Sequence, residues 1–112
     1  MNQSTGGFSP EIIRTQISLI VEEYKEFIDA IEVSLSTVQN QRAREAALKE
    51  LSDLVYVCFQ LAAAAGWELD EALDRVHESN MSKLVDGKPL KREDGKVLKG
   101  PNYKKPTLID LI

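Results

Sequence analysis

The chain has 112 residues, of which 43% are hydrophobic and 29% charged, and its formal net charge is −4. This is the size and composition of one globular domain, expected over residues 1–112. A membrane-spanning protein is excluded because the longest apolar stretch, residues 54–65, falls well short of the roughly 20 residues that a membrane span needs. The charge is uneven, since residues 1–82 carry a net charge of −8 and residues 83–105 a net charge of +5. An acidic body suits cations and a basic segment suits phosphate.

The first residues and the cysteine content bear on location. Residues 1–10 are polar and lack the basic cluster and apolar run of a secretory signal. Cys58 is the only cysteine of the sequence, so an internal disulfide is impossible. A lone cysteine suits a reducing compartment, and we therefore expect a cytoplasmic protein.

Three helices are predicted in chain order. Ser9 is a good N-cap for the first, in which apolar residues recur in steps of three and four to about residue 33. The second is predicted over residues 41–65, with Gly66 as its stop, and a shorter third over residues 69–84. The stripes expected to face inward are Ile13, Ile17, Ile20, Tyr24, Phe27 and Ile31, then Leu48, Leu51, Val55, Cys58, Ala62 and Ala65, then Leu69, Leu73 and Val76.

The chain changes character after the third helix. An Asp94-Gly95 turn between two short apolar segments predicts a β-hairpin that pairs residues 90–92 with residues 97–99. We therefore expect an all-α bundle of antiparallel helices, completed by oligomerisation. Its helical body covers residues 9–85 and its short basic tail residues 86–112.

Acidic residues stand three apart on both long helices, Glu23 with Glu26 and Glu50 with Asp53. Residues at this spacing project from one side of a helix. At about 100° per residue, each pair borders its apolar stripe on the same rotational side, so antiparallel packing would bring the four carboxylates together. A divalent cation would offset their repulsion, and all-oxygen ligands favour Mg²⁺ or Mn²⁺. The alternative is a solvated acidic face.

The same residues carry a family resemblance. Glu22-Glu23-x-x-Glu26, followed after 23 residues by Glu50-Leu51-x-Asp53-Leu54, resembles the signature of the all-alpha nucleotide pyrophosphohydrolases, which include the MazG-like proteins. The segments 78–83, 94–96 and 100–103 are similar to small MazG-like proteins of phages and bacteria in particular. The resemblance implies that Glu23, Glu26, Glu50 and Asp53 are the metal ligands of a catalytic site. It also implies that the protein works in a bacterial cell or a phage-infected host.

Further candidate site residues follow from position and from the resemblance. The sequence leaves three roles for Glu22: a solvated side chain, a ligand of a second metal ion, or the group that activates the attacking water. Asn80 falls on the expected inner stripe of the third helix, with Lys83 on the same face. Asn80 is either a satisfied buried amide or, as the resemblance implies, a contact to the nucleoside or a phosphate, with Lys83 neutralising the triphosphate. The substrate-binding candidates from the tail are Arg92, Tyr103 and Lys104.

The expected function is a Mg²⁺- or Mn²⁺-dependent nucleoside triphosphate pyrophosphohydrolase that releases a monophosphate and pyrophosphate. The tail's resemblance to phage-type enzymes favours deoxynucleotides, with dGTP and dCTP as leading substrates. Two alternatives stay open: a phosphoribosyl-ATP pyrophosphatase, and a helical interaction module without catalysis. The acidic overall charge and the lack of aromatic residues among the tail lysines argue against a nucleic-acid partner.

The long helices carry more apolar residues than one stripe can bury. Each such side chain contributes roughly 1.5–3 kcal/mol when it is fully buried, so a second copy of the chain is expected to cover the excess. Two helices from each chain would then form a four-helix bundle in a homodimer or homotetramer. The residues expected to need this cover are Ile12, Leu19, Ile28, Leu54, Phe59 and Leu61.

Overall fold

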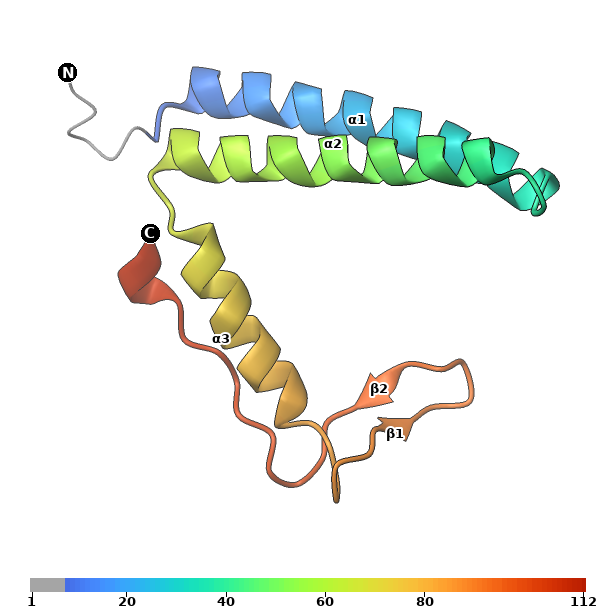
Figure 1. Cartoon of the computed structure of the whole chain (residues 1–112). Coiled ribbons are helices and arrows are strands. Elements are labelled where there is room, and N and C mark those ends of the chain that lie inside the picture. The colour runs from blue at the N-terminus through green and yellow to red at the C-terminus, as the bar shows by residue number, and fades with distance from the viewer. Residues whose placement is uncertain (1–7) are drawn as a thin grey trace. The chain divides into compact units, whose positions relative to one another are not determined.

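The computed structural model describes residues 8–112, which form two compact units, residues 8–67 and residues 68–112. The expected all-α class is confirmed, since helices predominate and the described chain has one small two-stranded antiparallel sheet. The elements, labelled in Figure 1, are α1 (Pro10–Ser36), α2 (Gln41–Ala65), α3 (Leu69–Met81), β1 (Leu90–Lys91), β2 (Val97–Leu98) and the 3-10 helix η2 (Ile109–Leu111). None of the helices between residues 8 and 112 is long and apolar enough to cross a membrane.

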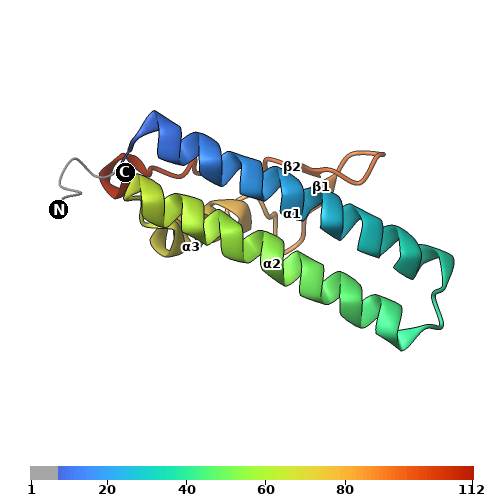
Figure 2. The same ribbon diagram turned by 90° about the horizontal axis from the view of Figure 1, so that it is seen from above.

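In the first unit, α1 and α2 form an antiparallel hairpin and lie side by side along their length (Figures 1 and 2). The bounds of α2 are those predicted from the sequence. At its start, Asn40 Oδ1 accepts hydrogen bonds from the backbone N–H groups of Arg42 and Ala43, at 3.0 and 3.2 Å. At its end, Gly66 adopts the left-handed conformation with φ 78°. These caps satisfy backbone groups that a helix end leaves without partners, and they therefore fix both ends.

The contact between α1 and α2 is made by smaller side chains than the sequence predicted. Ala43, Ala47, Val57, Ala62 and Ala65 are buried along α2, and Ser34 is buried on α1. Because alanines make up most of this buried line and let the two helices approach closely, most of the larger side chains lie beside it. Half-buried or buried, as predicted, are Ile13, Ile20, Phe27, Ile31, Cys58, Ala62 and Ala65. The prediction was wrong for five residues with exposed fractions between 40% and 63%, namely Ile17, Tyr24, Leu48, Leu51 and Val55.

One side of the helical hairpin is apolar. Phe27 and Ile31 from α1 line a groove of about 260 Å³ with Leu48 and Leu51 from α2, and its remaining lining residues are Ser34, Arg44 and Ala47. At about 100° per residue, the exposed Val55 lies on the same side of α2. We call these residues, 27, 31, 48, 51 and 55, the apolar face. Of the residues expected to need cover from a second copy, Ile12 and Phe59 are exposed, whereas the half-buried ones are Leu19, Ile28, Leu54 and Leu61.

In the second unit, the C-terminal segment of the chain returns along α3 and is held there by polar contacts. Ser79 Oγ donates a hydrogen bond to the backbone carbonyl of Lys104 at 2.7 Å. The backbone N–H of Lys104 donates in turn to Ser82 Oγ at 2.8 Å. These two bonds close residues 104–112 against α3 near its end.

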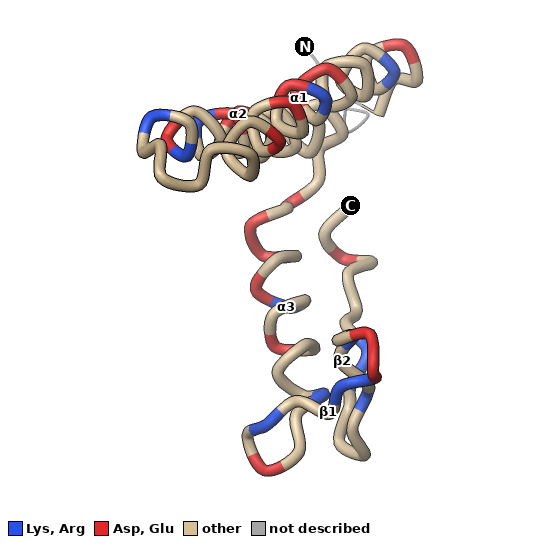
Figure 3. The backbone as a smooth tube through the Cα atoms, turned by 90° about the vertical axis from the view of Figure 1, so that its right-hand side faces the viewer, with Lys and Arg blue, Asp and Glu red and all other residues tan. Residues whose placement is uncertain are grey.

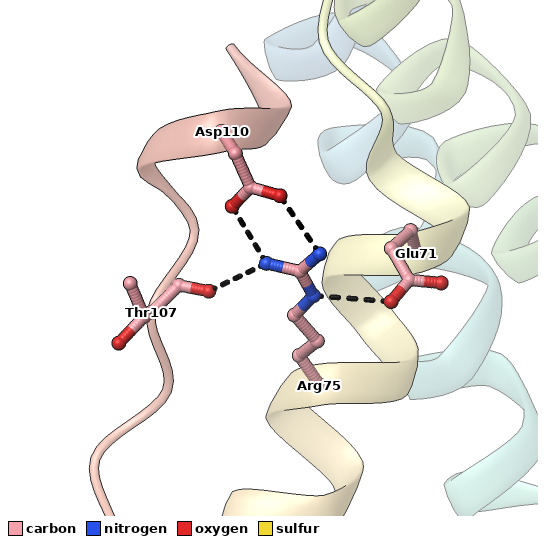
Figure 4. A network of polar contacts seen from close by, with 4 residues as sticks. All are labelled: Glu71, Arg75, Thr107 and Asp110. Atoms are coloured by element: carbon pink, nitrogen blue, oxygen red, sulfur yellow. Dashed lines mark hydrogen bonds and ion pairs between the residues drawn. The ribbon is translucent and has the colours of Figure 1, made fainter.

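Arg75 holds the last turn of the chain (Figure 4). Its guanidinium donates to both carboxylate oxygens of Asp110, at 2.7 and 2.9 Å. It also donates to the carbonyl of Thr107 at 2.9 Å and to Glu71 Oε2 at 3.0 Å. The hydrogen bonds from Arg75 lower the pKa of Asp110, and the bonds to Asp110 and Glu71 raise the pKa of Arg75. The arginine therefore fixes η2 to α3.

This polar packing explains two corrections to the third helix. Leu73, predicted to face inward, is 50% exposed, and Asn80, predicted on the inner stripe, is exposed. The buried residue of α3 is instead Ser79. The helix contacts the C-terminal segment through hydrogen bonds, so its buried side does not follow its apolar stripe. It also ends at Met81 rather than at about residue 84.

The predicted β-hairpin is confirmed. Leu90 pairs with Leu98 and Lys91 pairs with Val97, in antiparallel register. The turn between them is set by Asp94, whose Oδ1 accepts the backbone N–H of Lys96 at 3.1 Å.

Candidate active site

Three glutamates meet where α1 and α2 pack together. Glu23 and Glu26 come from α1 and Glu50 from α2, and one carboxylate oxygen of each lies within 4.8 Å of the others. Glu23 and Glu50 are half-buried because they stand on the contact line between the helices, whereas the sequence placed them beside it. Glu26 is exposed. We call this group the glutamate cluster.

Among residues 8–112, no lysine or arginine pairs with Glu23 or Glu26 of the glutamate cluster. The pKa of Glu26 is raised above its ordinary value, first by the charge of Glu23 and then by the loss of solvent around the carboxyl group. The charges of Glu50 and Glu22, and a hydrogen bond with Glu50, raise it further. Glu22 itself is exposed and lies outside the cluster. Converging carboxylates of this kind favour either a proton or a cation.

The glutamate cluster fits a divalent metal ion. Oε1 of Glu23 and Oε1 of Glu50 are buried, and neither has a hydrogen-bond partner among residues 8–112. A buried carboxylate oxygen without a partner is costly, and a cation bound there would remove the cost. The cluster offers oxygen ligands alone, which suit Mg²⁺ or Mn²⁺ rather than a metal that prefers nitrogen or sulfur.

Asp53, the fourth expected ligand, lies outside the group of three and is paired with a lysine. Lys49 Nζ lies 2.7 Å from Asp53 Oδ2 and 3.7 Å from Glu50 Oε2. The hydrogen bond and the charge of Asp53 raise the pKa of Lys49. Sequence reasoning missed this lysine, although the spacing of four residues between Lys49 and Asp53 is the signal of an ion pair on a helix.

The second unit brings Lys83 and Tyr103 together. Lys83 Nζ lies 5.9 Å from the centre of the Tyr103 ring, and Lys99 Nζ lies 4.9 Å from it. The backbone N–H of Gly100 donates to the carbonyl of Lys83 at 3.1 Å, which keeps the segment that ends in Tyr103 beside the end of α3. Asn80 and Lys83 line a pocket of about 330 Å³ with Leu84, Pro89 and Val97.

The other two predicted substrate contacts lie elsewhere in this unit. Arg92 is paired with Asp94 in the hairpin turn, at 2.7 Å between Nη2 and Oδ2. The exposed Lys104 lines a different pocket, also of about 330 Å³, with residues of α3 and of the C-terminal segment. Figure 3 shows that lysines and arginines gather around β1 and β2, while acidic residues recur along α1, α2 and α3.

A comparison with protein families agrees with the geometry. The helical hairpin with its paired acidic motifs defines an all-α domain of the MazG-like nucleoside triphosphate pyrophosphohydrolase type, as the resemblance in the sequence indicated. Residues 2–80 match the model of the family described as PRA-PH, phosphoribosyl-ATP pyrophosphohydrolase, and the chain belongs to this family. Membership implies a pyrophosphohydrolase activity in general. The match ends before Lys83 and the β-hairpin, and no match was found among curated proteins.

Proposed function

We propose that the protein is a Mg²⁺- or Mn²⁺-dependent nucleoside triphosphate pyrophosphohydrolase, which converts a triphosphate and water into a monophosphate and pyrophosphate. The observation that carries this proposal is the glutamate cluster, with two buried carboxylate oxygens that lack partners among the described residues. The family match supports the type of reaction.

In this proposal, Glu23, Glu26, Glu50 and Asp53 hold the ion. A bound divalent ion supplies charge stabilisation at the phosphate oxygens and lowers the pKa of a bound water. Glu22, whose charge acts on Glu26, is the candidate for accepting a proton from the attacking water. The three clustered glutamates stand on two helices that pack against each other, so their spacing is set by rigid elements.

The second unit would bind the substrate in this proposal. Lys83 is half-buried beside Tyr103, and its ammonium group can pair with phosphate oxygens. Asn80 shares a pocket with Lys83 and is the candidate contact for the nucleoside, and Tyr103 lies over the same lysine. Arg92 and Lys104 are secondary candidates, and Arg92 would have to leave Asp94 to reach a phosphate. We propose deoxynucleotides, dGTP or dCTP first, as substrates.

The family match favours one alternative substrate, phosphoribosyl-ATP, which gives the family its description. It carries the same triphosphate group, so the same carboxylates would serve. The two proposals therefore differ in the nucleoside that the second unit must accept.

The test is a screen of the purified chain against the common ribonucleotides, deoxynucleotides and phosphoribosyl-ATP, with Mg²⁺ or Mn²⁺ and with a chelator as the control. Phosphorus NMR or chromatography identifies the products. We expect a monophosphate and pyrophosphate, and inorganic phosphate as the first product would contradict the proposal. Preference for phosphoribosyl-ATP would support the alternative. No turnover and no metal binding would leave a helical interaction module.

We also propose that a second copy of the chain covers the apolar face. The exposed leucines and valine of α2, beside the half-buried Phe27 and Ile31 of α1, make a surface that an isolated chain leaves in water, and a second copy offers the same surface in return. The assembly would be a homodimer or a pair of homodimers.

A further inference from the structure

Lys49 is a charged residue of the first unit that the proposed function does not use. Its ammonium group lies 2.7 Å from Asp53 and 3.7 Å from Glu50, the two proposed metal ligands that come from α2. Its side chain is 66% exposed, so it can leave these carboxylates for solvent with little rearrangement. An exposed pair of this kind is weak, and it is readily exchanged for a stronger partner.

The acidic residues of α1 and those of α2 differ in their ion pairs. Among the ion pairs in the described part of the chain, none involves Glu22, Glu23 or Glu26 of α1. The carboxylates of α2 therefore have a cationic partner, Lys49, whereas the glutamates of α1 have none in that part of the chain. A divalent ion bound between the two helices would lie close to the ammonium group of Lys49, and the two cations would repel each other.

We propose that Lys49 is an internal counter-ion, which occupies Asp53 and Glu50 when no divalent ion is bound and is displaced when one binds. It acts through the ligands and is a positioning residue, which lowers metal affinity while it stabilises the metal-free hairpin. This inference rests on the proposed function, because it takes Glu50 and Asp53 as ligands.

The test compares Lys49→Met with Lys25→Met in the full chain. Lys25 is an exposed residue of α1 next to Glu26 in the sequence, and it is in no ion pair within residues 8–112, so the control removes the same charge without removing the contact. Isothermal titration with Mn²⁺ alone, without nucleotide, gives the dissociation constants. We expect Lys49→Met to bind Mn²⁺ about 3- to 10-fold more tightly than the wild type. Lys25→Met should differ from the wild type by about twofold or less, because solvent and salt screen its charge.

A second measurement separates displacement from a general charge effect. In a chelator, Lys49→Met should melt at a lower temperature than the wild type and Lys25→Met, because its carboxylates have lost their counter-ion. In saturating Mn²⁺ the difference should disappear, because the wild-type lysine has already left. Lys49→Arg keeps the charge and the contact, so it should behave as the wild type in both measurements.

The outcomes separate this inference from the function on which it rests. If the wild type binds no Mn²⁺, the proposed metal site is wrong and the counter-ion proposal is wrong with it. If the wild type binds Mn²⁺ as tightly as Lys49→Met does, or if the two melt alike in a chelator, the inference about Lys49 is overturned and the proposed function stands.

Discussion

The two units of the chain are stabilised in different ways. In the described part of the first unit, every side-chain hydrogen bond joins residues no more than six apart, such as the cap at Asn40. In the second unit, Ser79, Ser82 and Arg75 make side-chain bonds to residues 22 to 35 positions away. The first unit depends on helical periodicity and the second on particular polar contacts.

In the proposed function, this difference suits the two units to different tasks. A pair of long helices keeps carboxylates at fixed spacing, which is what a metal site requires. Short segments joined by polar contacts offer lysines and backbone groups at many angles, which suits the binding of a phosphorylated ligand. Variants in the first unit should therefore affect catalysis and assembly, and variants in the second should affect substrate binding and local stability.

The largest effect is expected from Glu50→Gln. Loss of this carboxylate should lower kcat by about 1,000-fold, because a catalytic metal ion supplies several kcal/mol of stabilisation. The metal-free protein should stay folded and melt slightly higher, since repulsion within the glutamate cluster falls. Steady-state kinetics with Mg²⁺ and thermal melting measure both effects. Asp53→Asn should also lower kcat, but it removes the ion pair with Lys49 and should therefore not raise the melting temperature.

The control for this variant is Glu45→Gln, an exposed glutamate of the same helix outside the cluster. It should keep normal kinetics. A near-normal kcat in Glu50→Gln would contradict the proposed metal site in the first unit. It would also contradict the proposed division of tasks between the two units.

The next effect concerns assembly. Leu48 is 63% exposed on the apolar face, and Leu48→Glu should raise the dissociation constant of the dimer by about 100-fold or more, because two buried leucines are lost per dimer. Light scattering at low micromolar concentration should give at least twice the 12.5 kDa chain mass for the wild type and a shift toward the single chain for the variant.

Val38→Glu is the matched control, since Val38 is 59% exposed but lies in the loop that joins α1 to α2 rather than on the apolar face. A wild-type protein of single-chain mass with full activity would rule the assembly out.

A smaller effect is expected in the second unit. Lys83→Met should raise KM about 10-fold with kcat nearly unchanged, because a charge-assisted bond to phosphate is worth roughly 1.5–3 kcal/mol and the metal site is untouched. Lys91→Met, an exposed residue of β1, removes the same charge and should leave KM unchanged. Equal KM values for the two variants would refute the role of Lys83. A point variant is sharper than truncation after residue 84, which would also remove the segment that packs on α3.

The smallest effect concerns Asp110, whose pKa is lowered by Arg75. A carboxyl group with a lowered folded-state pKa stabilises the fold above its ordinary pKa, and this contribution is lost as the pH falls through the folded value. Asp110→Asn should therefore melt a few degrees lower than the wild type at pH 7, and the difference should shrink below pH 4 or so. Circular dichroism at both pH values measures it, with the exposed Asp74→Asn as the control. A difference that persists in strong acid would show that the charge is not its source.

The ends of α2 and the turn of the β-hairpin could be predicted because local residues determine them. Asn40, Gly66 and the Asp94-Gly95 turn each act on backbone groups within four residues of themselves. The bounds of α2 and the position of the β-hairpin follow from these signals without knowledge of the rest of the chain.

The contact line between α1 and α2 could not be predicted in the same way. Each helix carries apolar residues over a wide arc, and the sequence does not say which part of the arc meets the other helix in the same chain. The small residues Ala43 and Ala47 are among those buried on α2. Glu23 and Glu50 lie along the same contact line and are therefore half-buried. The pairing of the acidic motifs was predicted, but not their burial.

The contacts of α3 lie further from prediction. Ser79 and Lys104 are 25 residues apart and follow no periodic pattern, so their hydrogen bond could not be expected from the sequence. For the same reason the buried position was assigned to Asn80 instead of its neighbour.

Gly100 allows the β-hairpin to form a loop whose two ends lie close together. A Cβ atom at this position would lie 2.6 Å from the carbonyl oxygen of Lys83 and 2.9 Å from Val85 Cγ2, so only glycine allows the two backbone segments to meet. Their hydrogen bond closes residues 84–99 into a loop whose two ends are pinned at one place. Loops with close ends tolerate exchange and changes of length at small entropic cost. Recombination or protein engineering could therefore graft a different hairpin between Lys83 and Gly100, while the helical hairpin keeps its carboxylates. If the second unit binds the substrate as proposed, such a graft would change the ligand that it accepts.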